Sequence, residues 1–196
     1  MTLAELRSLT VLSVTVPAEA ARRILALRLP RGVLWSALLL AAALNAILFA
    51  LSNILLPTPH MMPWIFQSPL VYFGLVVLAL VAFIQALVWV GQGLGGQGGT
   101  DEIMAVIVWM QYLRVLVQAA SLVLMLVFPI LSLVLVMAAT VIGVWILLHF
   151  IAQAHRLDGL GRAAFVVILS GLAVIIAASL FMALVLGPFT GDMSHV

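Results

Sequence analysis

The sequence predicts an all-α polytopic membrane protein, a bundle of five transmembrane helices with a short amphipathic, interfacial helix at the N-terminus. Of its 196 residues, 66% are hydrophobic and only 7% are charged. A soluble domain is closer to half apolar and a quarter charged, so this chain belongs in a membrane. Five apolar stretches are long enough to cross a hydrocarbon core of about 30 Å. We therefore expect a single five-span membrane domain over residues 33–188.

The segment before the first span, residues 1–32, is expected in the cytoplasm. Pro17 suits the first turn of a helix over about 17–29, in which Glu19 can pair with basic residues one turn later. We interpret this helix as lying in the membrane interface, with a plain basic flank as the alternative. Residues 3–16 fit either a helix or a strand. The expected interfacial anchors are Arg22, Arg23, Arg28 and Arg31.

Turn-forming residues divide the apolar part of the chain into its five spans. A proline-rich loop follows the first span, a glycine-rich loop follows the second, and Asp158-Gly159 precedes the fifth. Only Pro129 separates the third span from the fourth, which predicts a tight hairpin because one helix of that length would be twice what a bilayer needs. The spans are predicted at about 34–56, 69–91, 103–128, 130–153 and 163–187.

The arginines outside the spans predict the orientation of the chain. They lie only in the N-terminal segment and in the loop before the fifth span, where Arg156 and Arg162 stand. Five spans place these two regions on the same side of the membrane. By the positive-inside rule that side is cytoplasmic. We expect a bacterial inner-membrane protein with a cytoplasmic N-terminus and a periplasmic tail at residues 189–196.

Several kinds of functional site are not expected. The chain has no cysteine, which excludes thiol catalysis, Cys-ligated zinc and covalent haem. His149 and His155 are six residues apart, a spacing that does not suit a metal site on one helix. The chain also lacks the stripe of basic residues that a nucleic-acid-binding surface needs. We therefore predict no catalytic residue, no cofactor and no metal, and we expect His149 to form a hydrogen bond between helices.

Residues 91–96, GQGLGG, match the G-x-G-x-x-G pattern of dinucleotide-binding proteins. That site needs a strand before the glycines, whereas here a predicted membrane helix precedes them. We interpret the segment as a flexible loop. Thr100 is then expected to cap the third span, and Asp101 and Glu102 favour the positive end of its dipole.

Polar residues follow one another through the third span at positions 111, 114, 118 and 121. Spacings of three and four residues put them near one helical face. At about 1.5 Å per residue, polar residues of the first and second spans reach a similar depth. The sequence therefore predicts an intramembrane polar cluster that contacts a lipid, an anion or a partner, made of Asn45, Gln85, Gln111, Arg114 and Gln118.

Arg114 is the costly member of this cluster. A central arginine costs about 2.5–3.5 kcal/mol on insertion scales, which the surrounding apolar residues offset. Three interpretations stay open. The side chain snorkels to the interface, or amides and carbonyls within the bundle satisfy it, or it holds an anion such as a lipid phosphate or a partner's carboxylate.

Two stretches, TDEIMAVIVWMQYLRVLVQ and WILLHFIAQAHRLDGLGRAA, together with the lead-in ARRILALRLPRGVLWSALLL, carry a family resemblance. Over about residues 17–187 the chain resembles bacterial members of the Yip1-domain family. The resemblance implies a five-helix integral membrane domain and brings no catalytic motif. Eukaryotic members are associated with vesicle traffic, Rab-type GTPases and membrane shaping, and carry a longer cytoplasmic N-terminal region. The positions that match the pattern are Trp109, Tyr112, Arg114, Trp145, His149, His155 and Arg162.

These observations predict a non-enzymatic membrane protein that acts through helix–helix and lipid contacts. It would serve as a scaffold, a lipid organiser or an auxiliary subunit. The expected partners are membrane lipids and either a larger membrane protein complex or further copies of the chain, whereas nucleic acid is not expected. The alternative is a small transporter or channel with a polar or anion site around Arg114.

Overall fold

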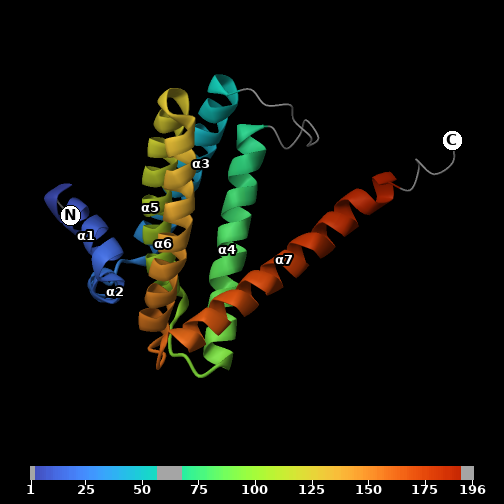
Figure 1. Cartoon of the computed structure of the whole chain (residues 1–196). Coiled ribbons are helices and arrows are strands. Elements are labelled where there is room, and N and C mark those ends of the chain that lie inside the picture. Colours follow the sequence, from blue (N-terminus) through green and yellow to red (C-terminus); the bar gives the residue numbers. More distant parts are fainter. Residues whose placement is uncertain (1–2, 57–67, 191–196) are drawn as a thin grey trace.

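The structure is a computed structural model that describes residues 3–56 and 68–190. Within these ranges the chain forms helices and no strand (Figure 1). Five helices, α3 to α7, are long and apolar enough to cross a membrane, which confirms the predicted fold class. The helices are α1 (Leu3–Thr15), α2 (Pro17–Ala26), α3 (Arg31–Leu55), α4 (Pro69–Gly93), α5 (Thr100–Val127), α6 (Pro129–His155) and α7 (Leu160–Thr190). Residues 57–67, which make up most of the predicted proline-rich loop, and residues 191–196 of the predicted tail lie outside the described residues.

Prolines begin several of these helices, because a proline in the first turn has no N–H to leave unpaired. Pro129 starts α6 directly after Phe128, so α5 and α6 form the tight hairpin that the sequence predicts. Two serines join the helices close to this turn. The Ser132 hydroxyl donates to the Ser121 carbonyl at 2.9 Å, and the two hydroxyl oxygens lie 2.8 Å apart. The hairpin is therefore held by hydrogen bonds as well as by apolar packing.

The helices α3, α4, α5 and α6 run side by side (Figure 1), with α5 packed against α3, α4 and α6. The core lies toward the end at which α4 and α6 end and α5 and α7 begin, which we call the glycine-loop end. Lipid tails are as apolar as these side chains, so close packing holds this core together in a bilayer. Its fully buried large apolar residues are Leu34, Leu38, Leu87, Ile103, Val106, Phe150, Ile151 and Val166.

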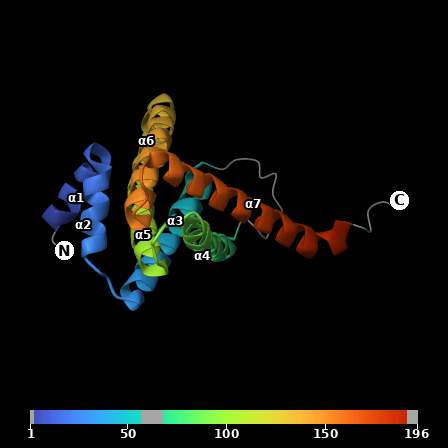
Figure 2. The same cartoon turned by 90° about the horizontal axis from the view of Figure 1, so that it is seen from below.

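The last helix, α7, leaves the bundle. Its first turns pack on α4 and α6, where Ala163, Val166 and Ser170 are fully buried. Beyond this contact the helix diverges from the others in both Figure 1 and Figure 2. All of residues 175–184 are exposed in the single chain. Among the α7 residues whose exposure is described, those up to Leu184, only the glycine-loop end is therefore fixed by its own chain.

The N-terminal segment forms two helices, so residues 3–15 are helical rather than extended. Seen from below, α2 lies lengthwise in the plane of the picture, whereas α4 is seen almost along its axis (Figure 2). The amphipathic α2 is confirmed, with its apolar residues Ala20, Ala21 and Ile24 buried against α5 and α6. The predicted end at residue 29 is wrong. Helix α2 ends at Ala26, because Arg28 takes a left-handed conformation (φ 43°) and the residue before Pro30 is kept out of the helical region.

Candidate functional site

The polar residues of α5 do not share one environment. Gln111 is buried, Gln118 is half-buried and Arg114 is exposed. A step of three residues at about 100° each leaves a side chain about 60° away from its starting direction. The stripe that the spacing predicts is therefore wide enough to put Gln111 inside the bundle and Arg114 on its surface.

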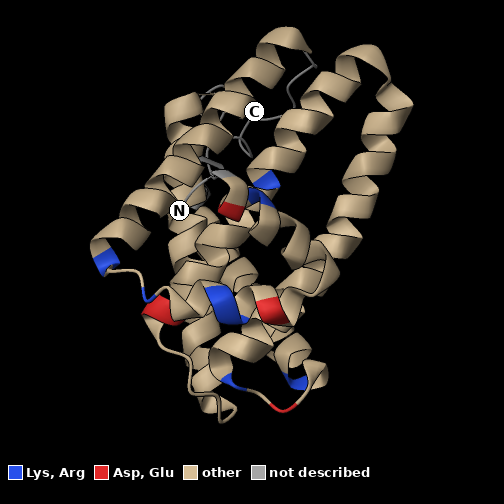
Figure 3. Ribbon diagram, turned by 90° about the vertical axis from the view of Figure 1, so that its left-hand side faces the viewer, with Lys and Arg blue, Asp and Glu red and all other residues tan. Residues whose placement is uncertain are grey.

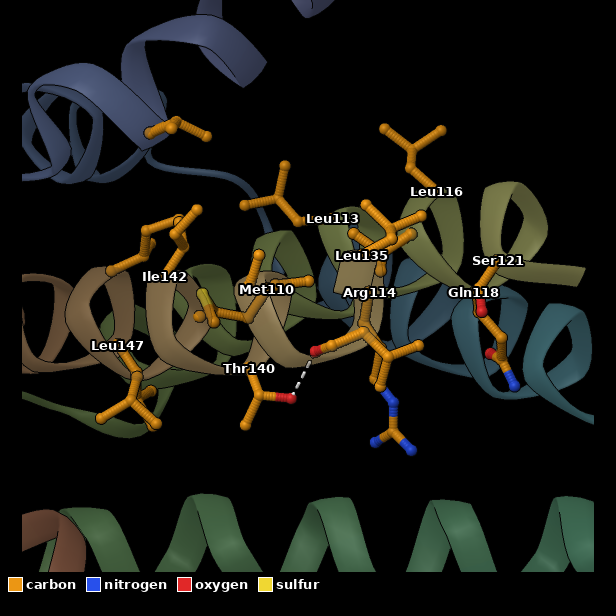
Figure 4. A pocket seen from close by; sticks show the side chains of 18 of the residues that line it. Met110, Leu113, Arg114, Leu116, Gln118, Ser121, Leu135, Thr140, Ile142 and Leu147 are labelled. Carbon is orange, nitrogen blue, oxygen red and sulfur yellow. Dashed lines mark hydrogen bonds between the residues drawn. The ribbon is translucent and has the colours of Figure 1, made fainter. Parts of the chain in front are cut away.

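No hydrogen bond or ion pair joins Arg114 to any residue that the structure describes. In Figure 4 its guanidinium extends toward the side on which α4 lies, apart from the amide of Gln118. The internal hydrogen-bond network that was one of the three interpretations of Arg114 is thus not formed within the described part of the chain. The interpretations in which it snorkels or holds an anion are left.

The side-chain amides of the predicted cluster are not joined to one another. The Asn45 Nδ2 donates to the Ala41 carbonyl of its own helix at 2.8 Å. The side-chain oxygens of Asn45, Gln85, Gln111 and Gln118 are buried and have no hydrogen-bond partner in the described residues. An unsatisfied buried acceptor costs about 1–3 kcal/mol, so these oxygens favour a donor from outside the described residues, such as water.

A groove of about 780 Å³ follows the seam between α5 and α6, and Arg114 lines it. We call it the Arg114 groove. Its α6 wall includes Ala139 and Gly143, small residues one helical turn apart (Figure 4 shows the groove from close by). Apart from its chain neighbours and the backbone of its own helix, no described atom lies within 4 Å of the position that a Cβ on Gly143 would occupy. A second helix can approach the backbone closely at such a site. Further lining residues are Thr10, Val14, Met110, Leu113, Leu116, Val117, Gln118, Ser121, Thr140 and Leu147.

A second, smaller groove of about 270 Å³ lies between α3 and the α5–α6 hairpin. Polar side chains of Ser52, Gln118, Ser121 and Ser132 line it beside apolar ones. Gln118, whose side-chain oxygen has no partner in the described residues, lines both grooves. This groove is large enough for water and offers the polar partners that water needs.

The glycine loop, which we define as residues 91–99, is packed around one buried histidine, and its interpretation as a plain flexible loop is wrong. The fully buried His155 accepts a hydrogen bond at Nδ1 from the Gly98 N–H (3.2 Å), so Nε2 carries the proton and donates to the Leu87 carbonyl (3.1 Å). A Cβ added to Gly91, Gly96 or Gly98 would meet the imidazole. The glycines are needed here because the loop touches the ring with its backbone.

Most charged residues gather toward the glycine-loop end, and the described residues at the opposite end carry no charge (Figure 3). Arg31 at the start of α3 donates to both carboxylate oxygens of Asp101, at 2.8 and 3.0 Å. Arg156 donates to the Glu102 carboxylate at 3.1 Å. Glu102 also accepts from the Gly99 N–H at 2.8 Å, so Gly99 is the cap of α5 and the prediction of Thr100 is wrong.

Three of the four predicted interfacial anchors have partners within the protein. Glu19 accepts hydrogen bonds from Arg22 and Arg23 on the exposed side of α2. These bonds lower the pKa of Glu19 below its usual value. Arg31 is bound to Asp101, and Arg28 lies in the turn after α2. All four arginines are exposed, so they remain accessible to headgroups.

The hydrogen bond of His149 stays within one helix. Its Nδ1 lies 2.9 Å from the Trp145 carbonyl, four residues earlier in α6, and the two rings pack edge to face at 4.1 Å. The expected bond between helices is therefore not formed. The reason is that the carbonyl one turn back lies within reach of the ring.

Comparison with known families agrees with this architecture. The sequence profile of the Yip1 domain family matches residues 11–182, which includes α2 to α6 and most of α7. The chain belongs to the Yip1 domain family. This Yip1 protein is a multi-pass membrane protein with five candidate spans. No curated protein and no solved structure matches it.

Proposed function

We propose that this Yip1 protein is a non-enzymatic scaffold or auxiliary subunit of a membrane complex, acting through contacts between helices and with lipids. The observation that carries the proposal is Arg114, an exposed cation about halfway along a candidate span and without a partner in the described residues. Charged groups within a bilayer are paired or face a polar cavity, because an unpaired charge is costly there. A group outside this chain is therefore expected at Arg114.

Purification in a mild detergent tests this function. We expect the wild-type protein to carry a second protein or tightly bound lipid, seen as extra mass by native mass spectrometry. Arg114→Leu should insert and accumulate normally but lose part of that retained mass, and Arg114→Lys should be intermediate because lysine lacks the planar fork of arginine. Recovery of the wild type as a bare monomer would contradict the proposal.

The second candidate is a small transporter or channel. The buried, unpaired amide oxygens of Asn45 and Gln111 favour it, since polar groups in a bundle interior can line a route for a polar solute or anion. Arg114 would be the anion site on that route. Flux measured in proteoliposomes separates the two functions, because a scaffold gives no anion-dependent flux in the wild type.

We also propose that the chain lies in a bacterial inner membrane with the glycine-loop end in the cytoplasm. The arginines at the start of α3 and at the end of α6 support this orientation, because basic residues are retained on the cytoplasmic side. The periplasmic side would then hold the hairpin turn at Phe128.

A further inference from the structure

On the basis of the function proposed above, we infer that the Arg114 groove is a docking site for a membrane-spanning helix of a different protein, one that carries a carboxylate at mid-membrane. The Arg114 guanidinium would bind that carboxylate, and the partner's backbone would lie along the small residues of α6. Charge, depth and groove shape each support this occupant.

The first step concerns charge. All six acidic residues of the chain lie outside the interior of its predicted spans. Asp101 and Glu102 are in the first turn of α5 and are already bound to Arg31 and Arg156, and Glu5 lies in α1, which is not a span. No span of a second copy of this chain therefore carries a carboxylate at the level of Arg114. A spanning helix that brings a carboxylate to this level must belong to a different protein.

The second step concerns depth. Arg114 lies about halfway along α5, which has 28 residues and is thus about 42 Å long. A hydrocarbon core of about 30 Å then places both headgroup layers about 15 Å from Arg114 along the membrane normal. Lipid phosphates lie in those layers, beyond the reach of an arginine side chain. A carboxylate on a spanning helix can lie at any depth, so it suits this position better than a lipid.

The third step concerns shape. The groove is lined by residues 110–121 of α5 and 135–147 of α6, about three turns of each helix. Its walls are mainly apolar, and Gly143 leaves its backbone open. Small residues separated by four positions are typical of close helix–helix contacts in membranes. The groove thus offers van der Waals contact along its length and one cation to fix the register of the partner.

A synthetic partner tests this site directly. The probe is a membrane-spanning helix of leucine and alanine with one central aspartate, and matched helices carry asparagine or leucine instead. The full chain, labelled at Asp158→Cys, is reconstituted in phosphatidylcholine vesicles, and association is measured by energy transfer. We expect the aspartate helix to bind about tenfold more tightly than the leucine helix, with asparagine between them.

Three variants locate the interaction. Arg114→Leu should remove the preference for aspartate, whereas Arg162→Gln, an exposed arginine outside the groove, should leave it unchanged. Gly143→Leu should weaken binding of all three helices without lowering the thermal stability of the chain, because its own structure leaves that space open. Equal binding of the aspartate and leucine helices to the wild type would overturn the proposal. So would a preference that persists in Arg114→Leu.

Two further experiments distinguish the proposed partner helix from the other possible occupants of the Arg114 groove, a lipid phosphate and a second copy of the chain. Adding phosphatidylglycerol to the vesicles should not reduce the preference for aspartate, and if it does, a lipid phosphate occupies Arg114 and the proposal is wrong. Energy transfer between two labelled copies should not depend on Arg114, and if it does, the groove joins copies of this chain. The synthetic helix reports on the groove even where native purification yields a bare monomer, so failure of the proposed function remains distinguishable.

Discussion

At the scale of single residues, His155 does more for the structure than its isolated position in the sequence indicates. Its imidazole touches the end of α4 and the glycine loop, and both ring nitrogens have partners. The ring occupies the space that side chains on three glycines would need. We therefore expect the glycine loop to tolerate substitution only at positions that face away from the imidazole.

Gly91→Ala and Gly93→Ala form a matched pair for this expectation. A Cβ at Gly91 meets the His155 ring, so the first substitution should destabilise the chain by about 1–3 kcal/mol. Nothing lies within 4 Å of a Cβ at Gly93, so the second should be neutral or stabilising by up to about 1 kcal/mol. Thermal unfolding in detergent gives both values. Equal stability of the two variants would show that the loop does not hold the ring.

Sequence reasoning found the polar residues of α5 but not their environments. The spacing of Gln111 and Arg114 fixes their relative direction on one helix, and it does not say which neighbouring helices fill the space beside them. The loop around His155 was missed for a related reason, because the Gly98–His155 hydrogen bond joins residues that are 57 positions apart. The recurring glycines were the available signal, and they were assigned to flexibility.

At the scale of secondary structure elements, the N-terminal helices pack against the bundle rather than lying apart from it. The Trp109 indole N–H of α5 donates to the buried Ser13 hydroxyl of α1 at 2.9 Å. Ser13 in turn donates to the Leu9 carbonyl at 2.8 Å. This chain of hydrogen bonds fixes α1 beside the Arg114 groove, which Thr10 and Val14 help to line. Weakening the Ser13 contact should therefore loosen α1.

Ser13→Ala leaves the Trp109 N–H buried without an acceptor, which should cost about 1–3 kcal/mol. Hydrogen–deuterium exchange of the α1 amides should become faster in this variant. Ser8→Ala is the control, because the Ser8 hydroxyl is exposed and bonds only within α1. Unchanged exchange in Ser13→Ala would show that apolar packing alone holds the helix.

The spans could be predicted from the sequence because their length and apolar character are imposed by the bilayer. The hairpin at Pro129 followed from the same constraint. The ends of the N-terminal helices could be predicted from the sequence less accurately than the spans. Residues 3–15 lack a clear period, and the end of α2 depends on the left-handed turn at Arg28 that leads the chain into α3.

At the scale of the whole molecule, the ends of the helices divide into two sets. The ends of α4 and α6 and the starts of α3, α5 and α7 come together at the glycine-loop end, where ion pairs join Arg31 to Asp101 and Arg156 to Glu102. The start of α4 and the α5–α6 turn lie at the other end (Figure 1). This division, together with the positive-inside rule, makes the orientation testable.

Single cysteines can report the orientation, since the chain has no cysteine of its own. In intact cells, Ser68→Cys at the start of α4 should react with a membrane-impermeant maleimide. Asp158→Cys in the turn before α7 is exposed in the structure but should be protected until the membrane is broken. Labelling in the opposite pattern would reverse the proposed orientation.

The divergence of α7 is the feature of the whole molecule that hydropathy could not predict. The apolar side chains of the fifth span suit the hydrocarbon core equally well whether α7 packs along α4 or diverges from it. Its direction depends on where buried contacts stop, after Ser170. Apolar residues of similar size lie on both sides of that point, so the composition of α7 does not indicate where its packing against the bundle ends.

The contact between the glycine loop and His155 also implies an order of events during synthesis of the chain. A ribosome makes the loop well before it makes His155, the residue on which the loop closes. The Gly98 N–H can meet its acceptor only after the whole α5–α6 hairpin has been synthesised and inserted, because the last residue of α6 carries the imidazole. Nascent chains that stop short of residue 155 should therefore expose the loop to protease, and chains that extend past α6 should protect it.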